Sequence, residues 1–379
     1  MSGAIAPLLV EGEPLAPRLN PNLLGQDEAE TLLRAAWDSG RLPHAWLITG
    51  PRGVGKATLA FRFARFVLAN GCDAGGAPIV SGLALDENHP IFRRVASGGH
   101  SDMLVIERGI DPKRKKLRSE IVVDDVREAA RFLHLTPAEG DWRVVIVDTA
   151  DEMNRNAANA LLKILEEPPR QSLLLLVSHA PGRLLPTIRS RCRRLRLPPL
   201  DAATIDAAIA ASAPDLPDED RALLPMLAEG SLGRALELAA SGGLDQQREV
   251  MEFLLGLPAL DTARLHELAD RLAGAGNENA FRAAAELVLW WVARFIRFAQ
   301  TGRGEPEIVA GEAALMQRLR AGGGLDRWLS LWDKLGRLFA AAAGADLDRK
   351  QVWIGAFLDM SGIPMPPPSP SSSGRSAAR

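Results

Sequence analysis

Gly50-Pro51-Arg52-Gly53-Val54-Gly55-Lys56-Ala57-Thr58 is the most informative segment of the chain. It follows the apolar residues 45–48 and precedes a helical pattern over residues 59–68. That order of strand, glycine-rich turn and helix is typical of a phosphate-binding loop. Glycines let backbone N–H groups surround phosphate, the helix start adds its positive end, and a lysine adds a point charge. The segment therefore predicts a nucleotide cradle that contains Gly50, Gly53, Gly55 and Lys56.

One part of this cradle is missing. Such loops carry a hydroxyl directly after the lysine, where it holds Mg²⁺, and this chain has Ala57 there. Thr58 has a hydroxyl, but one residue further along a helix turns the side chain by about 100°. We therefore expect Ala57 and Thr58 to belong to the nucleotide site without supplying its metal ligand.

Composition limits the class of protein. A chain of 379 residues predicts two or three domains with buried cores, and its net charge of −2 gives no overall attraction to DNA or membranes. Cys72 and Cys192 are the two cysteines of the chain, which are too few for a disulfide framework or a four-cysteine zinc site. The N-terminus does not resemble a signal peptide, and residues 287–298 are too short and too charged to span a membrane. We expect a soluble cytoplasmic protein.

Three further apolar segments predict strands. Residues 144–147 form a β-branched run that ends at Asp148, residues 172–178 form a second buried run, and residues 103–106 form a shorter one. Because predicted helices alternate with these strands, the fold class is α/β, a doubly wound parallel sheet with helices on both faces. Ligands bind such sheets at the carboxyl ends of the strands, where the loop, Asp148 and Ser178 would meet.

Helical patterns surround these strands. Residues 1–20 are rich in proline and predict an irregular arm, and residues 27–37 predict the first helix. In the helix after the loop, the pattern buries Leu59 and Phe63 and exposes Arg62 and Arg65. A helix over residues 124–133 would have Asp124 as its N-cap.

Beyond Pro198-Pro199 the sequence predicts helices alone. Short ones are expected over residues 202–211, 218–228 and 232–240, and longer ones over residues 245–255, 262–273, 280–299, 312–320, 325–342 and 349–360. The predicted domains are residues 1–199, a three-helix lid over 200–243, a helical collar for oligomerisation over 244–363, and a disordered tail over 364–379. In the helix at 325–342, one broad face predicts core or subunit interface, and it contains Leu325, Trp328, Leu331, Trp332, Leu335, Leu338 and Phe339.

Asp148 follows four apolar residues, which is the Walker B position that orders Mg²⁺. Active ATPases of this architecture have a glutamate next, to polarise the attacking water, whereas this chain has Thr149. The hydroxyl and the base are thus both missing, which predicts very slow hydrolysis. Two interpretations remain open: nucleotide binding without turnover, or a loop that only holds the sheet together.

A third group of motifs resembles a specific protein family. The sequence Asn159-Ala160-Leu161-Leu162-Lys163-Ile164-Leu165-Glu166-Glu167-Pro168-Pro169, followed by a strand and Ser190-Arg191-Cys192, is similar to bacterial DNA polymerase III clamp-loader subunits of the AAA+ family. Gly25-Gln26, His44-Ala45 and Gly230-Ser231-Leu232 also match. The resemblance covers residues 21–240 with specific motifs and the rest in outline. The broken Walker motifs resemble the delta-prime class within this family.

This resemblance implies an AAA+ domain, a lid and a collar within a pentamer that places the sliding clamp on primed DNA. The partners would be gamma/tau and delta subunits, with no membrane. Arg191 stands where the family carries an arginine that reaches the ATP site of a neighbouring subunit. The chain would belong to the DNA polymerase III holoenzyme, a nucleotidyltransferase, while its own ATPase is inactive and ATP or ADP is bound without turnover.

The sequence also departs from the family. Relatives carry a four-cysteine zinc module after the first helix, but only Cys72 remains here, so we predict no zinc and no other metal. The lid arginine of motor subunits is replaced by Gly233, with Arg234 one place late. The basic run at residues 113–118 is either a DNA contact or a solvated loop.

Three alternatives remain open at this level. The chain could be an ATP-hydrolysing gamma/tau-type motor, which Ala57 and Thr149 argue against, or a scaffold whose arginine has no catalytic effect. A solvated basic edge is also an alternative to the arginine finger, since Arg189, Arg193, Arg194 and Arg196 surround Arg191.

Overall fold

The computed structural model describes residues 6–71, 82–110, 118–240, 244–274, 276–304, 307, 309–322, 324–343 and 347–362. These residues form two compact units, which divide between Ala240 and Ser241. Each unit has its own buried residues and is described by itself. The expected disordered tail at 364–379, Cys72 and residues 113–117 of the basic run lie outside the described residues.

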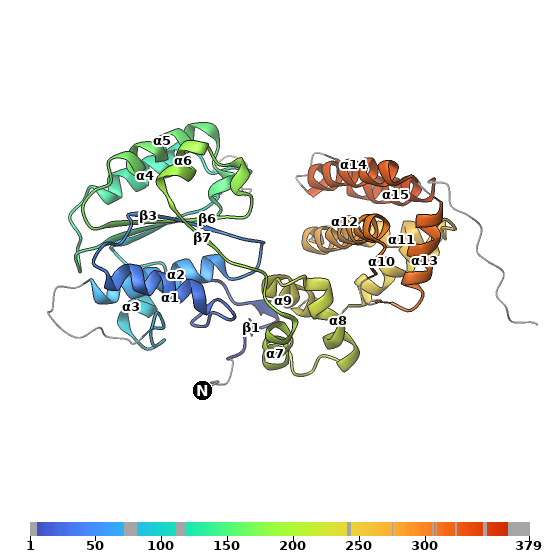
Figure 1. Ribbon diagram of the computed structural model, residues 1–379, viewed down its shortest axis with the longest axis horizontal. Coiled ribbons are helices and arrows are strands. Elements are labelled where there is room, and N and C mark those ends of the chain that lie inside the picture. The colour runs from blue at the N-terminus through green and yellow to red at the C-terminus, as the bar shows by residue number, and fades with distance from the viewer. Residues whose placement is uncertain are drawn as a thin grey trace, which may run out of the picture. The chain divides into compact units, whose positions relative to one another are not determined.

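A five-stranded parallel sheet forms the centre of the first unit (Figure 1). Its order is β4-β5-β6-β3-β7, and neighbouring strands pair in parallel throughout. The strands are β3 (Ala45–Thr49), β4 (Met103–Ile106), β5 (Arg143–Val147), β6 (Ser172–Ser178) and β7 (Arg193–Arg196). Every residue of β3, β5 and β6 is buried, as the continuous apolar runs predict for strands covered on both faces.

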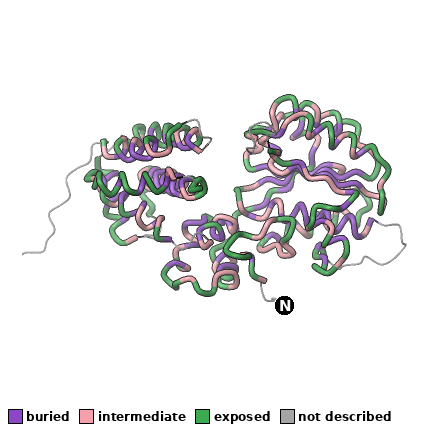
Figure 2. The backbone as a smooth tube through the Cα atoms, turned by 180° about the vertical axis from the view of Figure 1, so that it is seen from behind, coloured by how far each residue is buried: buried purple, intermediate pink, exposed green. Residues whose placement is uncertain are grey.

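Helices cover both faces of this sheet, which confirms the predicted fold class. One face packs against α1 (Asp27–Asp38), α2 (Lys56–Asn70) and α3 (Pro90–Ala96). The other packs against α4 (Val123–Leu133), α5 (Arg155–Glu166) and α6 (Pro186–Arg191). Figure 1 shows the two helical layers on either side, and Figure 2 shows the buried strands between them in purple. Two short 3-10 turns, η1 (Ala150–Glu152) and η2 (Pro181–Arg183), follow β5 and β6.

The first unit also contains the lid and a small hairpin. The lid consists of α7 (Ala202–Ser212), α8 (Asp218–Ala228) and α9 (Leu232–Ala240). The hairpin is β1 (Leu9–Val10) and β2 (Glu13–Pro14), which replaces part of the irregular arm expected there. Leu8 is buried, and its N–H donates to Ser212 Oγ at 2.9 Å, because the arm packs on the lid.

Two expectations for helices of this unit were wrong. Arg62 and Arg65 on α2 are 7% and 1% exposed, because the N-terminal arm covers that face and supplies carbonyl acceptors. Arg65 donates to Arg18 O at 3.2 Å and to Asn20 O at 2.8 Å. The N-cap of α4 is Val122 rather than Asp124, and the Asp125 carboxylate accepts the Val122 N–H at 3.1 Å.

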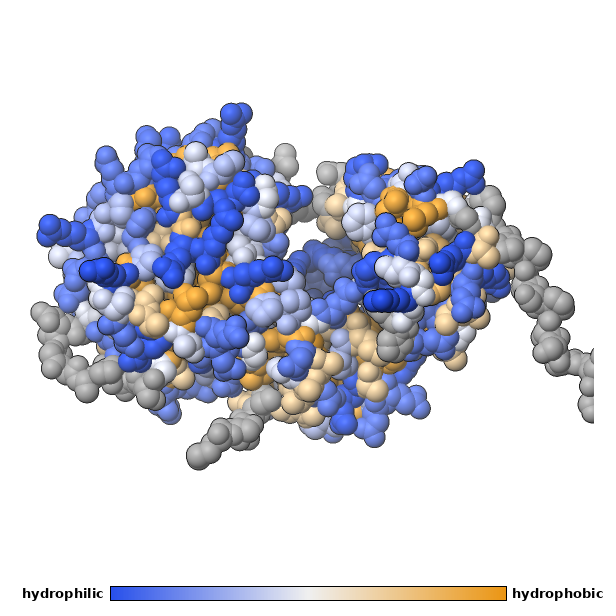
Figure 3. Space-filling view, viewed as in Figure 1, coloured by the Kyte–Doolittle hydropathy of each residue, from blue (hydrophilic) through white to orange (hydrophobic). Residues whose placement is uncertain are grey.

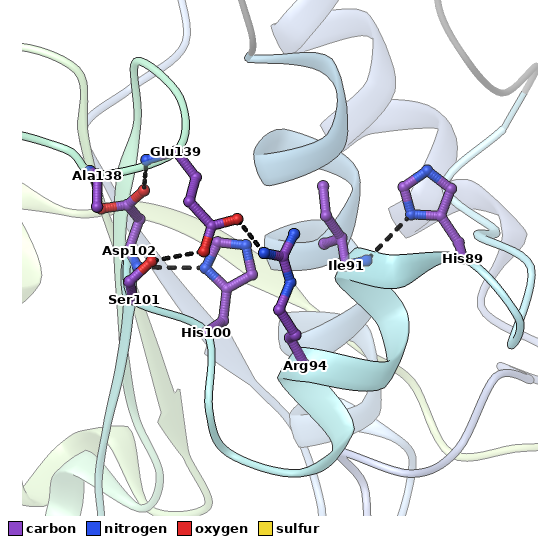
Figure 4. A network of polar contacts seen from close by, with 8 residues as sticks. All are labelled: His89, Ile91, Arg94, His100, Ser101, Asp102, Ala138 and Glu139. Carbon is purple, nitrogen blue, oxygen red and sulfur yellow. Dashed lines mark hydrogen bonds and ion pairs between the residues drawn. The ribbon is translucent and has the colours of Figure 1, made fainter.

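A polar network closes the amino ends of β4 and β5 (Figure 4). The buried Asp102 carboxylate accepts the N–H groups of Ala138 and Glu139 at 2.7 and 2.8 Å. His100 Nδ1 accepts the Asp102 N–H at 3.2 Å, and the Glu139 carboxylate pairs with Arg94. Burial lowers the pKa of His100. These contacts connect α3 to the start of the sheet.

The second unit is helical. Its elements are α10 (Asp245–Gly256), α11 (Thr262–Ala273), α12 (Glu278–Thr301), α13 (Glu312–Ala321), α14 (Leu325–Ala343) and α15 (Arg349–Ser361). Aromatic contacts join them, for example Phe295 on α12 with Trp328 on α14, at a centroid distance of 4.9 Å. Trp332 departs from the predicted buried face of α14, since it is 43% exposed. In Figure 3, hydrophobic side chains (orange) reach the surface over α14 and α15.

None of the helices, within the part of the chain that the structure describes, combines the length and apolarity required to cross a membrane.

Candidate nucleotide site and arginine surface

The phosphate-binding loop has the predicted structural setting. It runs from the end of β3 at Thr49 to the start of α2 at Lys56. Gly50, Gly53 and Gly55 all have positive φ angles, 149°, 74° and 94°, which L-residues rarely adopt. A Cβ on Gly50 would lie 2.4 Å from Leu197 O, so no larger residue fits there. The loop therefore keeps the backbone geometry of a phosphate cradle.

Lys56 points back into its own loop. Its side chain is buried, and Nζ donates to Gly50 O at 2.8 Å and also to Pro51 O. Burial lowers the pKa of Lys56 to about 8, although the nearby Asp151 and Asp148 oppose that shift. The ammonium group thus lies at the mouth of the cradle, where an anion would meet it.

Asp148 lies at the carboxyl end of β5, beside the loop, as predicted. Burial raises the pKa of its carboxyl, and Oδ1 accepts the Thr149 N–H at 3.1 Å. Thr149 has φ 52° and begins the turn η1, so the chain leaves the sheet at once. The position next to Asp148 therefore carries no carboxylate toward the site.

The two acids that follow make contacts with neighbouring loops. Asp151 Oδ1 accepts the His179 N–H at 2.9 Å, and Glu152 Oε2 pairs with Arg108 Nε at 2.8 Å. Both carboxylates hold loops at the edge of the sheet. Directly after Asp148 the chain carries Thr149, and the acids that share the cavity with Asp148 include Glu107 and Glu152.

A cavity of about 590 Å³ lies over the loop. It is lined by the loop and the start of α2, by the N-terminal arm, by the ends of β4, β5 and β6, and by α9 of the lid. Ala57 and Thr58 both line it. Lining residues that the sequence analysis missed include Leu23, Arg52, Glu107, Arg108, Glu152, His179 and Leu236. Glu107 and Arg108 follow a predicted parallel strand directly, and that position was a usable signal.

The lid contacts the loop through two glycines. Gly233 N–H donates to Gly53 O at 2.9 Å, and a Cβ on Gly233 would lie 2.9 Å from Gly53 Cα. By the resemblance described above, Gly233 stands where motor subunits carry an arginine. Its lack of a side chain lets the lid backbone approach the loop, and the first turn of α9 occupies the space beside Gly53.

Arg191 lies elsewhere on this unit. It is the last residue of α6. Its guanidinium pairs with Glu166 Oε1 at 2.7 Å and donates to Thr187 O at 3.1 Å. Among the described residues that line the cavity, Arg191 does not occur. The structure therefore does not bring Arg191 to this chain's own loop.

The arginines after Arg191 occupy a strand that the sequence did not predict. Arg193, Arg194 and Arg196 lie on β7, at the edge of the sheet, and all three are exposed. Arg193 lies over the Trp46 ring at 5.5 Å. Cys192 is buried, which raises the pKa of its thiol to about 12.

The described residues contain no group of three or more His, Cys, Asp and Glu side chains that could hold a metal. Arg118, the described end of the basic run, pairs with Asp125 at 3.7 Å.

Comparison with known proteins identifies relatives. Residues 25–201 match the family model described as "DNA polymerase III, delta subunit". Over 209 residues the chain is 38% identical to DNA polymerase III subunit delta' of Pseudomonas aeruginosa, covering 55% of this chain and 60% of that protein. The Bacillus subtilis delta' subunit is 33% identical over 182 residues, covering 48% of this chain and 50% of that protein.

A tau subunit is also similar. The Escherichia coli DNA polymerase III subunit tau is 30% identical over 286 residues, covering 72% of this chain and 42% of that protein. The chain thus spans about 60% of the Pseudomonas relative and half or less of the other two.

Proposed function

We propose, from the premise that the chain belongs to the family of DNA polymerase III delta-prime subunits, that it helps to load the sliding clamp onto primed DNA as part of the clamp loader. The observation that carries this proposal is an AAA+ phosphate loop with its backbone geometry kept and its hydrolytic groups absent. Ala57 stands in place of the metal hydroxyl, and Thr149 stands in place of the base. Such a subunit would act on its neighbours rather than by its own turnover.

Gamma/tau and delta subunits are the proposed direct partners, with the clamp and primed DNA reached through the assembly. The second unit is the proposed oligomerisation collar, and exposed Leu329, Trp332 and Leu358 on α14 and α15 support that role. The cytoplasm is the proposed place of action.

The nucleotide site is proposed to bind ATP or ADP without turnover. The loop N–H groups and Lys56 would hold the phosphates, and Asp148 would face any accompanying metal. Bound ATP would supply a transferable phosphoryl group, but Thr149, at the position expected for the base, cannot activate water. No zinc is proposed.

Arg191 is the proposed arginine finger for a neighbouring ATP site. Three observations support a role in trans. Arg191 lies at the end of α6, its side chain is half-exposed, and it does not occur in the described lining of this chain's own cavity. An arginine brought to a phosphoryl group neutralises charge that develops on it in the transition state, and its planar fork matches phosphate oxygens.

The test uses the reconstituted clamp loader with DNA and clamp. Arg191→Ala should leave assembly intact and clearly lower stimulated ATPase and clamp loading, because removal of a trans arginine costs about 10³–10⁵ in rate at the site that borrows it. Arg191→Lys should not restore the rate. Arg194→Ala, an exposed arginine on β7, is the matched control and should be nearly silent. Equal effects of Arg191→Ala and Arg194→Ala would support a basic edge instead.

The motor alternative is tested on the isolated chain. Its ATPase rate should not exceed that of Lys56→Ala, because the metal ligand and base are both absent. A lysine-dependent rate near that of ordinary AAA+ motors would contradict the proposal.

A further inference from the structure

Two contacts hold the guanidinium of Arg191 in one orientation. Nη2 lies 2.7 Å from Glu166 Oε1, and Nη1 donates to Thr187 O at 3.1 Å. The side chains of Arg191 and Glu166 are 35% and 49% exposed, so the pair lies at the surface. Both terminal nitrogens are engaged, while other N–H groups of the guanidinium remain free to meet an anion.

Both side chains extend from fixed backbone. Glu166 is the last residue of α5, which Pro168 and Pro169 terminate, and Arg191 is the last residue of α6, which begins at Pro186. The two helices pack together through buried Ile164, Leu165 and Ile188. Directly after Arg191, the buried Cys192 anchors the chain. The distance between the two charges is therefore set by the core beneath them.

The sequence around Arg191 is rich in arginine and poor in acidic residues. Residues 168–200 contain seven arginines and no Asp or Glu. Arg189, Arg193 and Arg194 are close neighbours of Arg191 in the sequence. Of the acids that the structure describes, Glu166 is the one that pairs with Arg191.

We propose that Glu166 is a positioning residue that holds Arg191 ready to engage a phosphate in the neighbouring subunit. This inference rests on the proposed finger role of Arg191. An exposed ion pair contributes little to the free energy of folding. It does restrict the rotamers of the long arginine side chain in advance, so less conformational entropy is lost when that side chain meets its target. Preorganisation of this kind acts on the rate and not on substrate binding, which takes place on the motor subunit.

The first experiment measures the pair in the isolated chain. NMR of the arginine side chains would identify the Arg191 signal by its loss in Arg191→Ala. That signal should show restricted guanidinium motion in the natural protein and mobile behaviour in Glu166→Gln. Glu167→Gln, an exposed neighbour one residue further along, should leave it unchanged. A mobile Arg191 in the natural protein, or an unchanged signal in Glu166→Gln, would overturn the inference without reference to any activity.

The second experiment uses the reconstituted clamp loader. Glu166→Gln should lower kcat at the borrowed site by about 3- to 10-fold with KM unchanged, within the roughly 30-fold limit that full arginine rotamer entropy allows. Glu167→Gln should have no effect. In an Arg191→Ala background, Glu166→Gln should change nothing further, because its effect passes through Arg191.

The outcomes separate the two ideas. If Arg191→Ala is silent, the finger role fails, whatever Glu166 does. If Arg191→Ala lowers the rate while Glu166→Gln matches or exceeds the natural rate, the finger stands and the positioning role is wrong. An additive loss in the double variant would likewise overturn the positioning role.

Discussion

Gly53 is the residue where the phosphate loop and the lid approach most closely. Its φ is 74°, and a Cβ there would lie 2.2 Å from Ser231 Oγ and 3.1 Å from the Gly233 backbone. The serine side chain can rotate, but the lid backbone cannot withdraw without breaking the bond from Gly233 N–H to Gly53 O. The glycine thus serves both the cradle and the contact with the lid.

We expect Gly53→Ala to lower the free energy of unfolding by at least about 1–2 kcal/mol, the cost of a left-handed conformation for an L-residue, with the lid contact adding to it. Urea unfolding measures this. Gly182→Ala is the control, since a Cβ there meets nothing within 4 Å and no strained φ applies. Equal free energies of unfolding for the two variants would show that the lid does not restrict the space at Gly53.

His100 predicts a pH dependence of stability. Burial is the largest cause and lowers its pKa from the ordinary value of 6.5, while Glu139 raises it, Arg94 lowers it and Asp102 raises it, in decreasing order of effect. The folded state then binds fewer protons than the unfolded state, so this stability is complete above pH 6.5 and is lost as pH falls toward the lower folded pKa.

His100→Asn should therefore flatten the slope of unfolding free energy against pH on the acid side of 6.5. Urea unfolding at a series of pH values measures the slope. His134→Asn, at an exposed position after α4, should leave it as it is. If both variants keep the natural slope, other groups account for the acid sensitivity.

At the scale of elements, α2 holds the N-terminal arm in place. Arg65 donates to the carbonyls of Arg18 and Asn20 and lies over the Phe92 ring at 4.3 Å. Its burial lowers the pKa to about 10, yet the guanidinium stays charged at neutral pH. One side chain thus joins α2, α3 and the arm.

Arg65→Met should cost about 1–3 kcal/mol of unfolding free energy, because the two arm carbonyls lose their donors. Limited proteolysis should also cut the arm faster, which a mass spectrum of the fragments would reveal. Arg131→Met, an exposed change on α4, should stay within about 0.5 kcal/mol of the natural chain. An arm that stays protected in Arg65→Met would mean that the hairpin and lid hold it unaided.

The elements also show what sequence reasoning can and cannot provide. The strands β5 and β6 were predicted correctly, because a continuous apolar run has few alternatives to a buried strand. β7 was missed, since Arg193–Arg196 shows no apolar pattern and becomes a strand through pairing with β3. The arginines of α2 were wrongly predicted to be exposed to solvent, because helical periodicity does not reveal that a distant arm covers them.

The same distinction applies to the candidate site. The loop and Asp148 are local in sequence, and the structure places both beside one cavity, as predicted. The missing hydroxyl and base were inferred from Ala57 and Thr149, which are read directly from the sequence. The lining by Leu23, Arg108 and Leu236 depends on three segments that meet only in the folded chain. Likewise, the family resemblance of Ser190-Arg191-Cys192 could indicate Arg191, but not the Glu166 carboxylate that the packing of α5 against α6 brings beside it.

At the scale of the whole molecule, the two units contain different tryptophans, whose fluorescence can report on the unfolding of each unit. The chain has eight tryptophans and no tyrosine. Trp37, Trp46 and Trp142 lie in the first unit, and the other five lie in the second.

In the second unit, the pair Arg294 and Glu312 joins α12 to α13, with side chains 5% and 1% exposed and 3.4 Å between Nε and Oε1.

Arg294→Met should destabilise the second unit by about 3–5 kcal/mol, because it leaves the Glu312 carboxylate buried without its cation. Unfolding followed by tryptophan fluorescence should then show the second unit melting earlier, while the first keeps its midpoint. Adding Glu312→Leu should recover much of the loss, and Arg282→Met, at an exposed position on α12, should have little effect. A single transition that shifts as a whole would show that the units unfold together.

The position of β7 has a consequence for the free subunit. A strand at the edge of a sheet presents unpaired N–H and C=O groups, which form a template on which a second chain can add and start aggregation. Here that template carries the exposed charges of Arg193, Arg194 and Arg196. Two copies joined along β7 would place three arginines of each chain along the shared edge, and the repulsion between these like charges opposes self-association there.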